Sequence, residues 1–97
     1  MCGIAGILYR DRSRDVDQDL LARMTNVLGH RGPDSSGFHR VPGLGLGHRR
    51  LAIIDPAAGH QPMQDPASGN VIVYNGEVYN YVELRSELEA LGATFAR

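Results

Sequence analysis

Met1-Cys2-Gly3-Ile4-Ala5-Gly6-Ile7-Leu8-Tyr9 opens the chain, and this stretch decides how the rest is interpreted. Residues 3–9 are small and apolar, which is typical of a short buried strand. Cys2 is the single cysteine of the sequence. Removal of Met1 would leave Cys2 at the amino terminus, with a thiol and a free α-amine on one residue. An α-amine has an ordinary pKa of about 8, and it can serve as the base that a thiol nucleophile needs.

Two interpretations of Cys2 are open at this point. In the first, Cys2 is a catalytic nucleophile held at the end of a rigid strand. In the second, it is a small apolar residue at a chain end, because free cysteines are most often buried and unreactive. The position of Cys2 does not decide between these two interpretations, so the decision depends on the rest of the sequence.

The composition is that of one small globular domain. A chain of 97 residues buries about two thirds of its unfolded surface, which gives a modest core. The net charge of −1 gives no electrostatic reason to expect a nucleic acid or a membrane as partner. One cysteine excludes an internal disulfide framework and predicts a reducing, cytoplasmic location. No apolar run approaches the length of a membrane span.

A helix is predicted after the first strand. Asp15 or Asp17 is suited to cap it, its first turn lies near Gln18, and Gly29 is suited to end it. Residues 30–37 then predict a polar loop, because Gly, Pro, Asp and Ser favour turns. The helix carries an apolar stripe that is expected to pack in the core: Leu20, Leu21, Met24, Val27 and Leu28.

The middle of the chain predicts a hairpin. Residues 38–41 and 44–48 form its strands, and Pro42-Gly43 forms its turn. Glycines alternate with leucines in the second strand, so one of its faces is bare, and such a face often marks the close approach of other backbone. Residues 50–55 predict another short strand, and residues 59–63 predict a loop.

The last third predicts a strand followed by a helix. Residues 71–74 favour a strand, and Asn75-Gly76 favours a tight turn after it. Asn80 with Glu83 predicts a capped helix start. Residues 93–96 predict the beginning of a further strand, so we expect residues 1–97 to be part of a longer domain. The helix has an apolar face and a glycine suited to end it: Tyr81, Leu84, Leu88, Leu91 and Gly92.

Five motifs, taken in order, give the sequence a family resemblance. It resembles the class II glutamine amidotransferases, which are N-terminal-nucleophile hydrolases, and more narrowly the glutaminase domain of glutamine-dependent asparagine synthetases. The resemblance implies an α+β fold, the first half of a four-layer αββα sandwich with antiparallel sheets. Residues 1–97 would then be a partial glutaminase domain without its synthetase domain. The motifs are Met1-Cys2-Gly3-Ile4-Ala5-Gly6, His30-Arg31-Gly32-Pro33-Asp34, His48-Arg49-Arg50-Leu51-Ala52-Ile53-Ile54-Asp55, Gly59-His60-Gln61-Pro62-Met63 and Asn75-Gly76-Glu77-Val78-Tyr79-Asn80.

The resemblance implies three catalytic residues. Cys2 would attack the side-chain carboxamide of glutamine, while its own α-amine moves the proton. Asn75 and Gly76 would donate a side-chain amide and a backbone N–H to the oxyanion of the tetrahedral intermediate. The products would be a γ-glutamyl thioester on Cys2 and ammonia.

The resemblance also implies four residues that bind glutamine. Arg50 would hold the α-carboxylate through two parallel hydrogen bonds, and Arg49 would point to the opposite face of its strand. The backbone of Leu51 and Ile53 would line the pocket, and Glu77 would face the α-ammonium group. An aspartate of the family's pocket has no counterpart in residues 1–97.

Other chemistries have less support. The histidines have no cysteine or carboxylate at metal-ligand spacing, so no metal site is predicted. No Gly-x-x-x-x-Gly-Lys loop is present, so no cofactor is expected in this stretch. ATP and Mg are implied only for the synthetase domain of a full-length parent, which would amidate aspartate. A homodimer is also compatible with the sequence.

Two alternatives to this interpretation stay open. The chain by itself could be an inactive structural fragment. The glutaminase could also supply a different acceptor, as in β-lactam-forming or sugar-modifying relatives.

Overall fold

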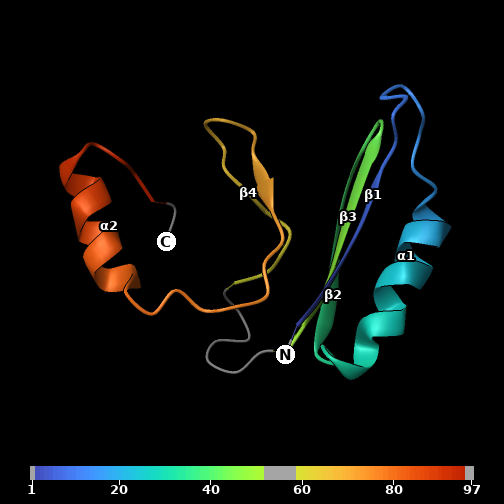
Figure 1. Ribbon diagram of the computed structural model, residues 1–97, viewed down its shortest axis with the longest axis horizontal. Coiled ribbons are helices and arrows are strands. Elements are labelled where there is room, and N and C mark those ends of the chain that lie inside the picture. The colour runs from blue at the N-terminus through green and yellow to red at the C-terminus, as the bar shows by residue number, and fades with distance from the viewer. Residues whose placement is uncertain (1, 52–58, 96–97) are drawn as a thin grey trace.

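The computed structural model describes residues 2–51 and 59–95 (Figure 1). Its N-terminal half is a three-stranded antiparallel sheet in the order β1-β3-β2, with a helix over one face. The fold is α+β with antiparallel sheets, as the sequence predicts. Within the described ranges, no helix has the length and apolar character that crossing a bilayer requires. The bounds in this half are β1 Gly3–Leu8, α1 Gln18–Asn26, the 3-10 turn η1 Val27–His30, β2 Ser35–Val41 and β3 Leu44–Arg50.

The start of α1 is as predicted, and its end is not. The Asp17 carboxylate accepts the backbone N–H groups of Asp19 at 2.9 Å and Leu20 at 3.4 Å. These bonds satisfy two donors that have no partner inside the helix. The helix stops at Asn26, and Gly29 lies inside η1 instead of ending α1.

The core lies between α1 and the glycine-bearing face of β3. Val16 is 1% exposed and Leu21 is fully buried. A Cβ atom on Gly45 would lie 2.9 Å from Val16 Cγ1, and one on Gly47 would overlap the hydroxyl of Thr25. That hydroxyl donates to the Leu21 carbonyl at 2.8 Å, so it is satisfied in the core. The bare strand face predicted from the sequence is therefore where the helix rests.

The predicted core stripe of α1 is only partly correct. Leu21 is buried and Leu28 is half-buried, but Leu20, Met24 and Val27 are exposed. The helix turns its Leu21 and Thr25 edge to the sheet, because the bare glycines accept a small side chain there. The other apolar residues of the stripe then fall on its flanks.

The hairpin of β2 and β3 is confirmed, and both strands are longer than predicted. Its turn is at Pro42-Gly43, where Gly43 has a φ of 85°, a value that glycine adopts without strain. Residues 35–37 belong to β2 and pair with the end of β3, so the predicted loop 30–37 is too long. Arg50 ends β3 instead of starting a new strand, and Leu51 follows outside any strand. Residues 52–55 of that predicted strand lie outside the described residues.

A second, two-stranded sheet pairs β4 (Met63–Gln64) with β5 (Val71–Ile72) in antiparallel fashion. It lies on the side of the large sheet away from α1 (Figure 1). The strand predicted at residues 71–74 is two residues long, and Met63 lies in a strand instead of a loop. Beyond β5, the backbone of Tyr74 bonds to the side chains of Gln61 and His48 instead of to a neighbouring strand.

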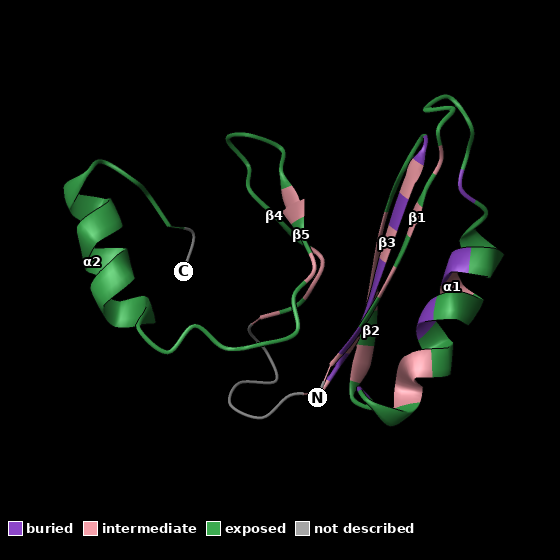
Figure 2. Ribbon diagram, viewed as in Figure 1, coloured by how far each residue is buried: buried purple, intermediate pink, exposed green. Residues whose placement is uncertain are grey.

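The last helix, α2, spans Tyr81–Ala90 and buries none of its residues (Figure 2). The predicted cap is wrong, because the Asn80 side chain makes no capping hydrogen bond. Gly92, with a φ of 97°, follows the helix end as predicted. Residues 93–95 form no strand, contrary to prediction, and residues 96–97 lie outside the described residues.

Candidate functional site

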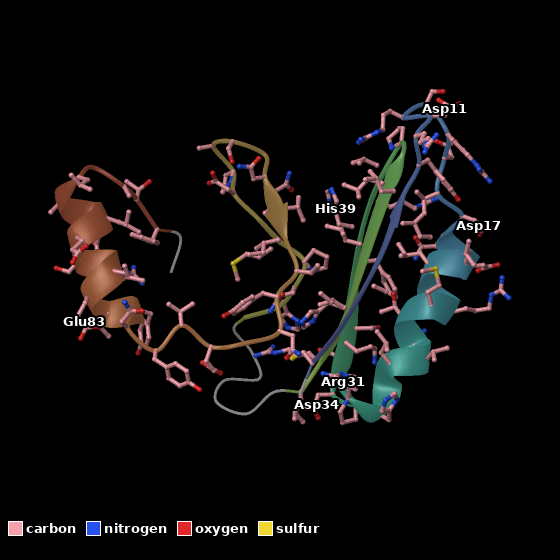
Figure 3. The ribbon with its side chains drawn as sticks, in the orientation of Figure 1. Asp11, Asp17, Arg31, Asp34, His39 and Glu83 are labelled. Carbon is pink, nitrogen blue, oxygen red and sulfur yellow. The ribbon has the colours of Figure 1, made fainter. Side chains whose placement is uncertain are left out.

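Cys2 is half-buried directly before β1, at one end of the large sheet. The backbone N–H of Leu51, the residue after β3, donates to Cys2 Sγ over 3.4 Å. The Arg31 Nε donates to the Cys2 carbonyl over 3.1 Å. Figure 3 shows Arg31 and Asp34 at this same end of the sheet, and the Asp34 N–H donates to the Arg50 carbonyl at 3.0 Å. Cys2 is therefore held through both its sulfur and its backbone.

An open pocket of about 490 Å³ lies beside Cys2. Its size suits a small organic ligand. The pocket brings Asn75 together with Cys2, although most of the chain separates them in sequence. The described residues that line it come from β1, the end of η1 and the segment after β5: Cys2, Gly3, Ile4, Leu28, Arg31, Val73, Tyr74 and Asn75.

Arg49 and Arg50 lie on opposite faces of β3, as predicted. Arg49 faces α1, where its Nε donates to the Gly32 carbonyl at 2.8 Å and its Nη1 to Asn26 Oδ1 at 3.2 Å. Arg50 is 9% exposed and faces away from α1. A Cβ atom on Gly59 would lie 3.4 Å from Arg50 Nη2, so the loop at Gly59 passes close to this guanidinium.

The other predicted site residues either do not line the pocket beside Cys2 or lie outside the described residues. Gly76 follows Asn75 and is packed near the Tyr74 ring, since a Cβ atom there would lie 2.8 Å from Tyr74 Oη. Glu77 is exposed. Neither is among the described residues that line the pocket. Ile53 lies outside the described residues. The substrate-binding roles of Arg50, Leu51, Ile53 and Glu77 stay predictions.

His48 has a role that the sequence did not reveal. Its side chain is 1% exposed, and its Nε2 lies 3.2 Å from the Tyr74 carbonyl oxygen. Burial lowers the pKa of His48, the Tyr74 carbonyl opposes that shift, and the charge of Arg50 adds to the lowering. Because a carbonyl oxygen can only accept, the Nε2 that faces Tyr74 is a protonated ring nitrogen in this contact. The period of two along β3, which puts His48 on the face of Arg50, was the available signal.

The described residues also bear on other chemistries. Within residues 2–51 and 59–95, no group of three or more His, Cys, Asp or Glu side chains is arranged to hold a metal ion.

Comparisons with known proteins cover the whole chain. A family model described as a glutamine amidotransferase domain matches residues 1–97. Asparagine synthetase [glutamine-hydrolyzing] 1 of Bacillus subtilis (strain 168) is 44% identical over an aligned length of 97 residues, and the match covers 98% of this chain and 15% of the relative. The nodule asparagine synthetase [glutamine-hydrolyzing] of Pisum sativum is 40% identical over 88 residues, which are 91% of this chain and 15% of the relative. The chain thus spans about 15% of the length of these curated relatives.

Proposed function

Because the chain belongs to the glutamine amidotransferase domain family, we propose that it contributes the glutaminase half-reaction of a glutamine-hydrolysing asparagine synthetase. The observation that carries the proposal is the pocket shared by Cys2 and Asn75. The residues that line the pocket include both a thiol and a side-chain amide. In acyl transfer, a thiol can act as the nucleophile and an amide as a hydrogen-bond donor to the oxyanion. The relatives are glutamine-hydrolysing asparagine synthetases by name.

In the proposed reaction, Cys2 becomes the terminal residue once Met1 is removed. Its α-amine accepts the thiol proton as Sγ bonds to the side-chain carbonyl carbon of glutamine. The tetrahedral intermediate then collapses, the C–N bond breaks, and the α-ammonium group returns a proton to the departing ammonia. Water hydrolyses the resulting γ-glutamyl thioester, which releases glutamate and restores the thiol.

The oxyanion of the intermediate accepts hydrogen bonds from the Asn75 side-chain amide and the Gly76 N–H. The position of Asn75 in the Cys2 pocket supports its part in this arrangement. Removing one such donor typically lowers the rate about 10²–10³-fold.

Glutamine is oriented in the proposal by its α-substituents. Arg50 holds the carboxylate, Glu77 faces the ammonium group, and the backbone of Leu51 and Ile53 lines the side chain. The burial of Arg50 supports its assignment, because a hydrogen bond from a guanidinium to a carboxylate is stronger where water is largely excluded. The N–H of Leu51 at the Cys2 sulfur supports the assignment of that backbone.

In the longer parent, the ammonia would amidate an ATP-activated aspartate. In this proposal, ATP and Mg would serve that synthetase domain. A four-layer αββα sandwich also belongs to the proposal. Ile4 and Leu8 are exposed on the sheet face away from α1, and this supports packing of a further layer there. The homodimer and the cytoplasmic location stay predictions.

The test measures glutamine hydrolysis together with intact mass after exposure to a diazoketone analogue of glutamine. One stoichiometric adduct on Cys2, blocked by excess glutamine, is the expected result. Cys2→Ser should give no adduct and no hydrolysis, and Asn75→Ala should lower kcat about 10²–10³-fold. An uncleavable residue ahead of Cys2 should also abolish activity. Hydrolysis that persists in Cys2→Ser would overturn the proposal.

One observation favours a second candidate for residues 1–97 expressed alone. No residue of α2 is buried, so this part of the chain lacks a packing surface. The isolated chain would then be an inactive structural fragment, while the longer parent hydrolyses glutamine. Running the same assay on both proteins separates the two candidates.

A further inference from the structure

We propose that His48 and Gln61 clamp the backbone of Tyr74 and thereby position Asn75 beside the Cys2 thiol. The inference rests on the proposed glutaminase function and assigns positioning roles to two residues that the proposed mechanism does not use. We call the two side chains the Tyr74 clamp.

The backbone of Tyr74 is held on both sides by side chains instead of by a strand. Its N–H donates to Gln61 Oε1, and its carbonyl accepts from His48 Nε2 at 3.2 Å. β5 ends at Ile72, so a chain that could have continued in the sheet leaves it before Tyr74. Tyr74 is 40% exposed, so the two side-chain hydrogen bonds, and not burial, hold its backbone where the ladder stops.

The clamp holds the residue directly before Asn75. The Tyr74 carbonyl and the Asn75 nitrogen belong to the same planar peptide, so holding the carbonyl also fixes the plane from which Asn75 projects. Asn75 lines the pocket with Cys2. An oxyanion donor has to lie within about 0.5 Å of its productive position, so this fixation bears directly on rate.

Both clamp residues are anchored to the sheet that also holds Cys2. His48 lies on the central strand β3, opposite Ile4 of β1 and Gly37 of β2. The Gln61 carbonyl is so close to Gly37 that a Cβ atom there would overlap it. The same strand β3 leads into Leu51, whose N–H reaches Cys2 Sγ. One sheet therefore sets the position of the nucleophile and, through the clamp, that of the amide.

The test uses paired variants in the intact protein. His48→Leu removes the donor, whereas His48→Gln keeps an amide donor near the place of Nε2. Gln61→Met removes the acceptor, whereas Gln61→Glu keeps one. We expect kcat for glutamine hydrolysis to fall about 10–100-fold in His48→Leu and Gln61→Met, with little change in KM. The two conservative variants should recover most of that loss.

A second readout separates positioning from damage to the fold. Iodoacetamide alkylates the Cys2 thiol by direct displacement and forms no oxyanion, so its rate should be the same in all four variants and the wild type. Alkylation that slows in parallel with hydrolysis would overturn the clamp, because the variants would then be disturbing Cys2 itself.

A double-mutant cycle tests whether the clamp works through Asn75. In an Asn75→Ala background, His48→Leu should cause no further loss of kcat, since the group that it positions is gone. Losses that multiply would overturn the inference.

Hydrogen exchange of the Tyr74 amide supplies a readout that does not need activity. The Tyr74 amide should be protected from exchange in the wild type and should exchange faster in Gln61→Met. A freely exchanging Tyr74 amide in a wild-type protein that hydrolyses glutamine would overturn the clamp alone. A longer parent protein that hydrolyses no glutamine would overturn the proposed function, and with it the inference.

Discussion

The sheet–helix region, residues 2–51, and the C-terminal region, residues 59–95, are stabilised in different ways. In the first, Val16 and Leu21 are buried between α1 and β3. In the second, α2 carries apolar residues of similar size and buries none of them. The ion pair and the ring contact of α2 are with residues nearby in sequence. Arg85 pairs with Glu89 at 3.4 Å, and its guanidinium lies 4.9 Å from the centre of the Phe95 ring. The difference shows that an apolar helical face stabilises a fold only where another surface covers it.

The largest expected contrast comes from truncating one leucine in each region. Leu21→Ala should lower the free energy of unfolding by about 3 kcal/mol, because it leaves a cavity under α1. Leu88→Ala should cost about 0.5 kcal/mol or less, since that side chain is 44% exposed. Urea denaturation measures both. Equal losses would break the comparison and would mean that α2 is covered in solution.

The two helix caps offer the next contrast. Asp17→Ala should cost about 1 kcal/mol, because two backbone N–H groups lose their acceptor. Asn80→Ala should leave stability nearly unchanged, because the Asn80 side chain caps nothing. Thermal unfolding and circular dichroism follow both variants. A cost for Asn80→Ala that matches the cost for Asp17→Ala would show an Asn80 bond that forms in solution.

Acid should weaken the contact between the two regions at His48. Burial holds the pKa of His48 below its ordinary value of 6.5, so the unfolded chain takes up the proton first as pH falls. The stability that His48 contributes is therefore complete above about pH 6.5 and is lost as pH falls through the folded pKa. His48→Gln should flatten this part of the stability profile in urea titrations across pH. An unchanged profile would mean that another group titrates there.

The smallest effect is expected for the exposed ion pair of α2. Glu89→Gln should cost about 0.3 kcal/mol at low salt and nothing measurable at high salt, because exposed pairs are screened. Helix content by circular dichroism, measured at both salt concentrations, checks this. A loss above about 1 kcal/mol would indicate a buried role for the pair.

The sequence predicted those elements whose signals are local. The strand at β1, the Asp17 cap and the Pro42-Gly43 turn each depend on neighbouring residues, and each is confirmed. Two local expectations failed as well, the Asn80 cap and Gly29 as the end of α1, whereas other failures depend on distant partners. The apolar stripe of α1 was misjudged because bare glycines on β3 select the small Thr25, and only the fold brings those residues together.

The residues of the candidate site also differ in whether the sequence could predict them. Motifs pointed to Cys2 and Asn75, and the structure places both in one pocket. The hydrogen bond from His48 to the Tyr74 carbonyl joins residues 26 positions apart, and no periodicity encodes that partner. The predicted strand at residues 71–74 was too long for a related reason. The β-forming residues of this run give no sign that the Tyr74 backbone bonds to side chains instead of to a strand.

The two faces of β3 place two separate sets of structural constraints on that single strand. Gly45, Gly47 and Arg49 meet α1 and its flanks, while His48 and Arg50 meet the segments that carry the site. Substitutions at alternate positions are therefore expected to affect different properties, one set the packing of α1 and the other the proposed site. A deep mutational scan along this strand would divide into two interleaved series, and each could drift without disturbing the other.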